Sequence, residues 1–157
     1  VWYFGSLVRT AWLDRGTRNN PIAAGSQYLF NHEIGFDDDG SAMTAFIESA
    51  AIDIGDGDKF TFIRRIVPDL TFSGSTNLSS PQAVFTVKSR RFPGASFDNT
   101  DSGTTTGSIS GDVETFTEQL HVRSRGRSFA VRVESTSIGT KWKLGSPRFD
   151  IRPDGRQ

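Results

Sequence analysis

The chain has 157 residues, enough for one domain with a core of its own, and 35% of its residues are hydrophobic. It contains no cysteine, which excludes disulfide bonds, thiolate metal sites and cysteine nucleophiles. The formal net charge is zero, which argues against a protein whose whole surface binds nucleic acid or an anionic membrane.

The N-terminal part begins with a strand-like run over 1–4 that starts with Val1 rather than Met. We therefore expect further residues before Val1 in the full protein. The window 41–51 fits a strand as well as a helix, because its apolar residues keep no sustained helical period. No apolar stretch approaches the about 20 residues that cross a bilayer, so the sequence predicts no membrane-spanning segment.

Strand patterns dominate the rest of the chain. Aromatic and β-branched residues predict strands over 60–67 and 83–88, and alternation of apolar with polar residues predicts strands over 116–123, 128–134 and 141–144. Turn residues separate these runs at Asp38–Gly40, Gly55–Asp58, Ser73–Ser75, Pro93–Gly94 and Gly126. Short strands at about 10-residue spacing predict an all-β fold, an antiparallel sandwich or barrel.

Residues 98–112 are polar, rich in Gly, Ser and Thr, and without periodicity. We predict an exposed loop or a hairpin tip here. Because the stretch is longer than an ordinary connection, it is also a candidate contact with another protein.

Catalytic motifs are missing. The two histidines, His32 and His121, each lie alone in a strand-like run with polar neighbours. The sequence lacks a Gly-x-Ser-x-Gly elbow, a His-Glu-x-x-His pair and a phosphate-binding glycine loop. We therefore predict no catalytic residue, no enzymatic activity and no cofactor.

Two acidic runs, Asp37–Asp39 and Asp53–Asp58, carry carboxylates that calcium would accept. The spacing of neither run matches the helix-flanked calcium loop. Asp followed by Gly is first of all a hairpin signal, so we predict turns at both places and no metal site.

A basic row follows the second histidine. Arg123, Arg125 and Arg127 come at every second position after His121, so a continued strand would place all four on one side of a sheet. Arg132 lies on the polar face of the next predicted strand. The row would pair with carboxylates of a neighbouring subunit, cover a solvated sheet face, or contact DNA phosphates without reading sequence. We favour an assembly contact.

Charge is divided unevenly along the chain. Residues 1–78 contain 6 Lys and Arg against 10 Asp and Glu, whereas residues 79–157 contain 12 against 8. A head-to-tail assembly would use such a division, but a solvated surface would also produce it.

The C-terminal segments Gln119–Ser135 and Trp142–Arg156 resemble the terminus common to many phage tail proteins. Four further segments add to the likeness: Ala11–Arg15, His32–Gly40, Phe46–Ser49 and Asp53–Asp69. Together they resemble the C-terminal region of the nozzle proteins of short-tailed phages, also named tail tubular protein B or packaged-DNA stabilisation protein. A similar terminal pattern recurs in structural proteins of long-tailed phages.

The resemblance implies a virion structural protein of the phage tail that forms a homo-hexameric ring and helps to retain and then conduct DNA. Residues 1–40 would be the end of a propeller-like domain or a linking segment. Residues 41–157 would form a β-sandwich platform domain with the exposed loop at 98–112. Tail adaptor, fibre or plug proteins and transiting double-stranded DNA are the implied partners, and the basic row becomes a candidate subunit-interface or channel-facing surface.

Two other interpretations stay open at this point. One is a receptor- or carbohydrate-binding β-sandwich module of a phage tail. Trp2, Tyr3, Trp12 and Tyr28 would then form a stacking platform, which requires them to be exposed. The other is a depolymerase, which needs two carboxylates facing each other across a cleft, and the sequence alone places no such pair.

Overall fold

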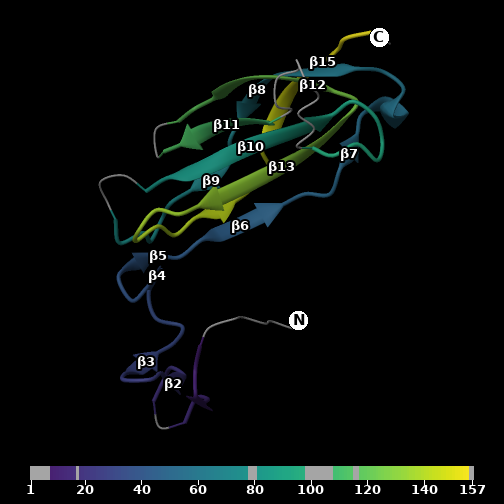
Figure 1. Cartoon of the computed structure of the whole chain (residues 1–157). Coiled ribbons are helices and arrows are strands. Elements are labelled where there is room, and N and C mark those ends of the chain that lie inside the picture. The colour runs from purple at the N-terminus through teal and green to yellow at the C-terminus, as the bar shows by residue number, and fades with distance from the viewer. Residues whose placement is uncertain (1–7, 17, 78–80, 98–107, 115–116, 156–157) are drawn as a thin grey trace. The chain divides into compact units, whose positions relative to one another are not determined.

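The computed structural model describes residues 8–16, 18–77, 81–97, 108–114 and 117–155 (Figure 1). The chain divides into two compact units, Val1–Gly35 and Phe36–Gln157. The fold is all-β with antiparallel sheets, as predicted. Within the described residues the one helical element is a short 3-10 turn, Gly55–Gly57.

The first unit is a three-stranded antiparallel meander of β1 (Ala11–Leu13), β2 (Ile22–Ala24) and β3 (Leu29–Asn31). Ala23 is buried at its centre, whereas Leu13 and Leu29 are 65% and 76% exposed. The predicted end of a propeller-like domain stays a prediction. The predicted strand over 1–4 lies outside the described residues.

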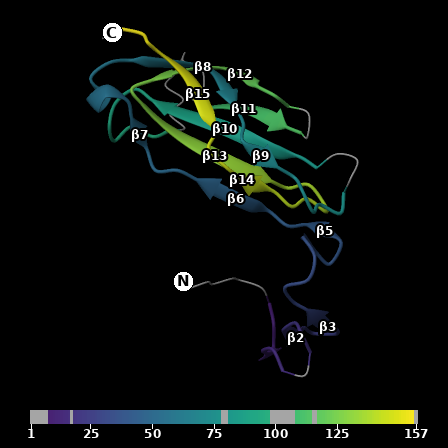
Figure 2. The same cartoon turned by 180° about the vertical axis from the view of Figure 1, so that it is seen from behind.

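The second unit contains two main sheets, which Figures 1 and 2 show from opposite sides. The large sheet has the strand order β11-β10-β13-β6, and β7 pairs with β13 beyond the end of β6. Its strands are β6 (Ala45–Glu48), β7 (Ile52–Asp53), β10 (Ala83–Arg90), β11 (Ser108–Val113) and β13 (Ser128–Ser135).

The small sheet has the strand order β12-β8-β15. Its strands are β8 (Thr61–Val67), β12 (Leu120–Gly126) and β15 (Arg148–Pro153). Two short antiparallel pairs complete the described strands of this unit: β4 (Asp37–Asp38) with β5 (Ser41–Ala42), and β9 (Leu70–Thr71) with β14 (Lys143–Leu144).

One apolar layer lies between the two main sheets. In β10 every second residue is buried, including Ala83, Phe85 and Val87, and the residues between them are partly exposed. The same cluster takes buried side chains from both sheets: Phe129, Val133, Ile63, Ile66 and Val122. The arrangement is therefore that of a sandwich, in which each sheet has an inward and an outward face.

The turn between β4 and β5 confirms the Asp-Gly interpretation. Asp39 and Gly40 have φ values of 49° and 82°, and the flanking Asp38 and Ser41 are paired. Two successive positive φ values belong to the two-residue hairpin turn that Asp-Gly favours.

The turn predicted at Gly126 does not join two paired strands, because β12 and β13 lie in different sheets. The Arg127 N–H donates a hydrogen bond to the carbonyl oxygen of Arg90, 3.0 Å away at the end of β10. A Cβ at Gly126 would lie 2.9 Å from the same oxygen, so the crossing needs glycine. The chain crosses here because Val122 reaches the core from the small sheet and Phe129 from the large sheet.

The predicted loop at 98–112 is a strand in its last part. Ser108–Val113 form β11 and pair with β10 from Ala83↔Val113 to Lys88↔Ser108. The free backbone groups on that side of β10 obtain partners through this pairing, although the sequence of 98–112 has no strand pattern. Residues 98–107 lie outside the described residues. The strand predicted to begin at 116 begins at Leu120.

The first compact unit ends at Gly35, and the predicted division after residue 40 into a propeller end and a platform domain stays a prediction. The carboxylate of Asp37 accepts a hydrogen bond from the Gly139 N–H, and the Lys141 ammonium lies 5.4 Å from the centre of the Phe36 ring. These contacts join residues 36–40 to the second unit.

The sandwich core predicts a large difference between two phenylalanines. Phe85 is 1% exposed and Phe92 is 55% exposed. Phe85→Ala should lower the free energy of unfolding by about 3–5 kcal/mol, because it removes a buried ring and leaves a cavity. Phe92→Ala is the matched control and should change it by less than about 0.5 kcal/mol. Urea unfolding measures the free energy of unfolding of both variants, and equal decreases in the two would contradict the assigned core.

Candidate functional site

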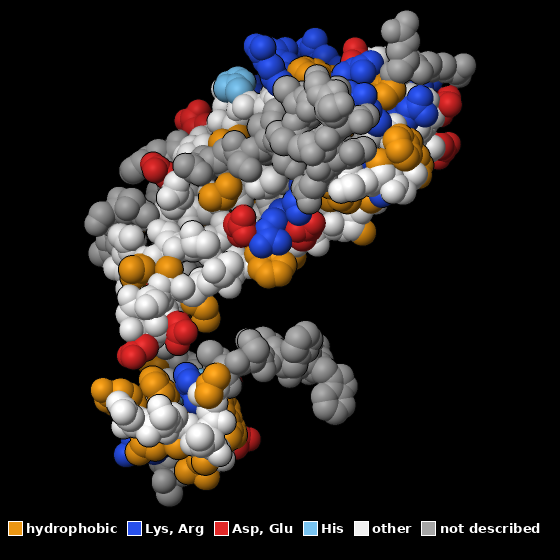
Figure 3. Space-filling model, viewed as in Figure 1, with side chains coloured by type: hydrophobic (Ala, Val, Ile, Leu, Met, Phe, Trp, Pro, Cys, Tyr) orange, Lys and Arg blue, Asp and Glu red, His pale blue; other side chains and the backbone are white. Residues whose placement is uncertain are grey.

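Six arginines lie on the outward face of the small sheet, which we name the arginine face. They come from β8, β12 and β15: Arg64, Arg65, Arg123, Arg125, Arg148 and Arg152. In β12 Val122 and Ser124 are buried, whereas His121, Arg123 and Arg125 are exposed, so the predicted alternation holds up to Arg125. Figure 3 shows Lys and Arg side chains gathered over the region of β8, β12 and β15.

Strand pairing aligns the arginine face in rows across the three strands. Arg125 lies opposite Phe62, and Phe62 lies opposite Arg152. A second row contains His121, Arg65 and Asp150 in the same way. Since neighbouring strands are about 4.8 Å apart, side chains within one row lie close together.

Both ladders of the small sheet are irregular at Arg64, between these rows. Val122 and Arg123 of β12 both lie opposite Arg64, and β15 has no residue opposite it. Such bulges change the direction of side chains locally. Arg64 and Arg123 line a shallow depression together with Phe62 and His121.

Carboxylates balance only part of the arginine face. The Arg65 guanidinium lies 4.0 Å from the Asp150 carboxylate, and the Arg125 Nε–H donates to the Asp154 carboxylate. Within the described residues, the other four arginines make no ion pair with a carboxylate: Arg64, Arg123, Arg148 and Arg152. The face therefore carries a local excess of positive charge in a chain whose net charge is zero.

Arg127 lies beyond the end of β12 and is half-buried. Its guanidinium carbon is 4.9 Å from the centre of the Phe60 ring, and that of Arg125 is 4.1 Å from the same centre. Phe60 is 7% exposed, so both cations cover a ring at the margin of the core. The predicted row of alternate positions ends at Arg125.

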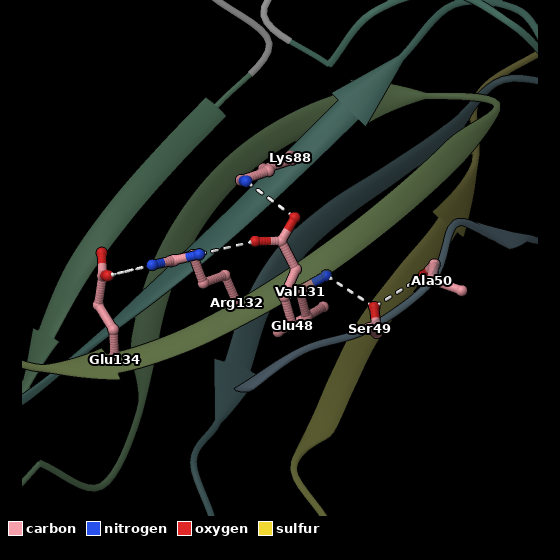
Figure 4. Close-up of polar contacts among 7 residues, drawn as sticks. All are labelled: Glu48, Ser49, Ala50, Lys88, Val131, Arg132 and Glu134. Carbon is pink, nitrogen blue, oxygen red and sulfur yellow. Dashed lines mark hydrogen bonds and ion pairs between the residues drawn. The ribbon is translucent and has the colours of Figure 1, made fainter. Parts of the chain in front are cut away.

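Arg132 lies on the outward face of the other sheet, in β13 (Figure 4). It donates to Glu48 at 3.1 Å and to Glu134 at 2.8 Å, and Lys88 donates to Glu48 at 2.9 Å. The Arg132 guanidinium also lies 4.0 Å from the centre of the Phe46 ring. Two cations and two carboxylates thus balance one another here, and the four predicted arginines do not form one row.

The sequence interpretation missed the arginines of β8 and β15. Arg64 and Arg65 were visible as a pair inside a predicted strand, and Arg148 and Arg152 lay near the C-terminus. Only the order β12-β8-β15 places them on the same face as Arg123. Strand order depends on contacts between distant segments, which the local pattern does not contain.

A second surface lies at the edge of the large sheet formed by β6 and β7. Large apolar side chains are about half exposed there; this set, which we name the apolar edge, comprises Met43, which precedes β6, and Phe46, Ile47 and Ile52 on the two strands. Large exposed apolar patches on a soluble domain commonly mark contacts with another molecule.

Aromatic side chains are exposed on the first unit. Trp12 is 55% exposed and Tyr28 is 70% exposed. The Trp12 ring lies 4.7 Å from the His32 ring, and Tyr28 meets Phe30 edge-on with 6.3 Å between ring centres. Trp12 and Phe30 lie opposite Ala23 on either side, so they share one face of the meander.

The two histidines have different surroundings. The Arg9 Nε–H donates to His32 Nε2 at 3.2 Å, whereas His121 is exposed on the arginine face. In the described parts of the chain, no hydrogen bond or ion pair joins either histidine to a carboxylate or to a nucleophile.

No family model matches the chain, and no curated protein matches it. Among the described residues, no three His, Asp or Glu side chains come together in a group that would hold a metal ion. Nor do the described residues include a helix of the length and apolar character that crossing a membrane requires.

The balanced network on the large sheet predicts a pH dependence of stability. The hydrogen bond from Lys88, followed by that from Arg132, lowers the pKa of Glu48. A group with a lowered folded-state pKa stabilises the fold above its ordinary pKa of about 4.3, and this contribution is lost as the pH falls through the folded-state pKa. Glu48→Gln should therefore destabilise the protein at neutral pH by about 0.2–1 kcal/mol.

Urea unfolding at neutral pH and at about pH 2 measures this effect, and the difference between Glu48→Gln and wild type should disappear at the lower pH. A background with Lys88→Met and Arg132→Met removes both donors and is the control. In that background Glu48→Gln should have no pH-dependent effect. A difference from wild type that is equal at both pH values would contradict the assigned network.

Proposed function

We propose that the chain is a virion structural protein, a ring-forming component of a phage tail nozzle or tail tube that helps to retain and then conduct DNA. Two lines support the proposal. The segments Gln119–Ser135 and Trp142–Arg156 resemble phage tail proteins, and the apolar edge has the properties of a subunit contact. The apolar edge is the observation that carries the ring-forming part of the proposal.

Two isoleucines of the apolar edge lie on the core side of the large sheet. Ile47 is paired with Val133 and Ile52 with Phe129, and paired residues point to the same face. Val133 and Phe129 are 1% and 2% exposed, but Ile47 and Ile52 are 53% and 49% exposed. The apolar layer of the sandwich thus reaches the surface at this edge, and a docked subunit would cover it.

The backbone of this edge favours contact through side chains. The Ser49 hydroxyl accepts the Val131 N–H at 3.0 Å and donates to the Ala50 carbonyl oxygen at 2.8 Å (Figure 4). Ile52 lies four positions after Glu48, whereas their partners Phe129 and Arg132 are three positions apart, so the edge carries a bulge. A bulge interrupts the straight row of backbone groups that an added strand would need.

A closed ring requires two different contact patches on each subunit. The apolar edge is one of them in this proposal. The six-fold symmetry, the location in the virion and the partners (tail adaptor, fibre or plug proteins) come from the resemblance alone. The proposal assigns no catalytic residue and no cofactor.

Ile47→Lys should prevent ring assembly, because it places a charge in the proposed contact. Ile138→Lys is a control, since Ile138 is also 53% exposed but lies in the turn before Gly139, outside strands β6 and β7. Sedimentation velocity and electron microscopy measure assembly, and circular dichroism checks the fold. The proposal would be contradicted if Ile47→Lys formed rings, or if the wild-type chain stayed monomeric at every concentration.

A receptor- or carbohydrate-binding module is the second candidate function, and one observation favours it. Trp12 and Tyr28 are exposed, as a stacking platform requires. Trp2 and Tyr3, the other members of the predicted platform, lie outside the described residues. The first unit would then bind the ligand while the second provides the scaffold.

A glycan array tests this candidate. Trp12→Ala should weaken binding to any positive glycan about tenfold, the value of one aromatic stacking contact. Leu13→Ala is the control, because Leu13 follows Trp12 in β1, points to the other face and is 65% exposed. An array without a positive glycan, or equal effects of the two variants, would exclude the candidate.

A further inference from the structure

The arginine face differs from an ordinary solvated surface in its charge balance. Surface cations and carboxylates are usually interspersed, as they are on the outward face of the large sheet, where Lys88 and Arg132 meet Glu48 and Glu134. On the arginine face, two of six arginines have a carboxylate partner among the described residues. An anionic partner would relieve the mutual repulsion of the other four arginines.

The use of arginine rather than lysine on this face indicates which kind of anion it binds. The cations on the three strands of this face are all arginines, although the chain contains lysines elsewhere. A guanidinium group presents a planar set of donors that matches a phosphate in a bidentate way, and it is less strongly hydrated than an ammonium group. Arginine is therefore the cation expected where phosphates are bound.

The shape of the face excludes two other kinds of nucleic-acid recognition. Its arginines stand on the strands of a sheet, so the described residues of this face offer no helix or projecting ribbon that would enter a groove and read base edges. Phe62, the aromatic residue among the arginines, is half-buried and flanked by Arg125 and Arg152. Binding to single strands uses several exposed aromatic rings as stacking platforms, and the described side chains of this face do not supply them.

We propose that the arginine face binds the sugar–phosphate backbone of double-stranded DNA without reading its sequence. The inference deepens the proposed function. It rests on that function only for naming DNA, rather than another double-stranded nucleic acid, as the ligand. Arg64, Arg123 and Arg152 make the main phosphate contacts, because no ion pair with a described carboxylate competes for them. This assignment replaces the assembly contact that the sequence favoured, because the face is wider and less balanced than the row on β12.

Fluorescence anisotropy with a labelled duplex of about 30 base pairs tests the proposal between about 50 and 200 mM salt. The wild-type chain should bind with an affinity that falls steeply with salt. The variant Arg64→Ala/Arg123→Ala/Arg152→Ala should bind at least about tenfold more weakly at the lower salt concentration, and its salt slope should be smaller by about 3. A second duplex of unrelated sequence should bind equally well.

Lys88→Gln/Arg132→Gln is the control, because it removes two cations, one fewer than the triple variant, from the balanced face of the large sheet. It should change DNA affinity less than about twofold. A loss of DNA affinity in this control comparable with that in the triple variant would overturn the proposal, since the net charge rather than the arginine face would then decide binding. Binding to heparin or to anionic vesicles without binding to DNA would also overturn it.

Sedimentation velocity of the same variants separates this proposal from the ring proposal. The triple variant should assemble as wild type does, and Ile47→Lys should lose assembly while each subunit still binds DNA. If the triple variant instead loses assembly and keeps its DNA affinity, the face is a subunit contact and the proposal is overturned. If DNA binding fails while rings form, the ring proposal stands without it.

Discussion

The pairing of β10 with β13 positions the other functional features of the second unit. Phe85 lies opposite Val133 and Val87 opposite Val131 in this ladder, and the alternate residues face outward. Turning Phe85 and Val133 into the core therefore directs Lys88 and Arg132 to the surface. A slip of one residue would exchange the two sets, and the burial of the apolar set makes this slip costly.

Local alternation was enough to predict the main strands but not their neighbours. The strands predicted over 60–67, 83–88 and 128–134 correspond to β8, β10 and β13, and Arg123 and Arg125 lie on one side of β12, as the alternation predicted. The crossing at Arg127 was not predictable in this way, because it depends on contact with β10. Strand β11 was missed for the same reason, since its polar residues pair with β10 without an apolar pattern of their own.

The two outward faces of the sandwich illustrate how little a net charge says about a surface. The large sheet places Arg132 between two carboxylates, whereas the small sheet places Arg64 and Arg123 beside an aromatic ring and a histidine. Both arrangements come from strands with the same alternation. The difference lies in which strands are neighbours: β6 brings Glu48 to Arg132, but β8 lies between two strands that also carry arginines.

The crossing from β12 to β13 has a mechanical consequence. One residue, Arg127, links the arginine-bearing strand to the strand whose other side holds β6 and β7. A force applied to the arginine face is thus transmitted to the apolar edge through this one-residue covalent link and then through the backbone hydrogen bonds that join β13 to β6 and β7. Inserted residues at Gly126–Arg127 would lengthen this link and uncouple the two surfaces, even if both sheets kept their folds.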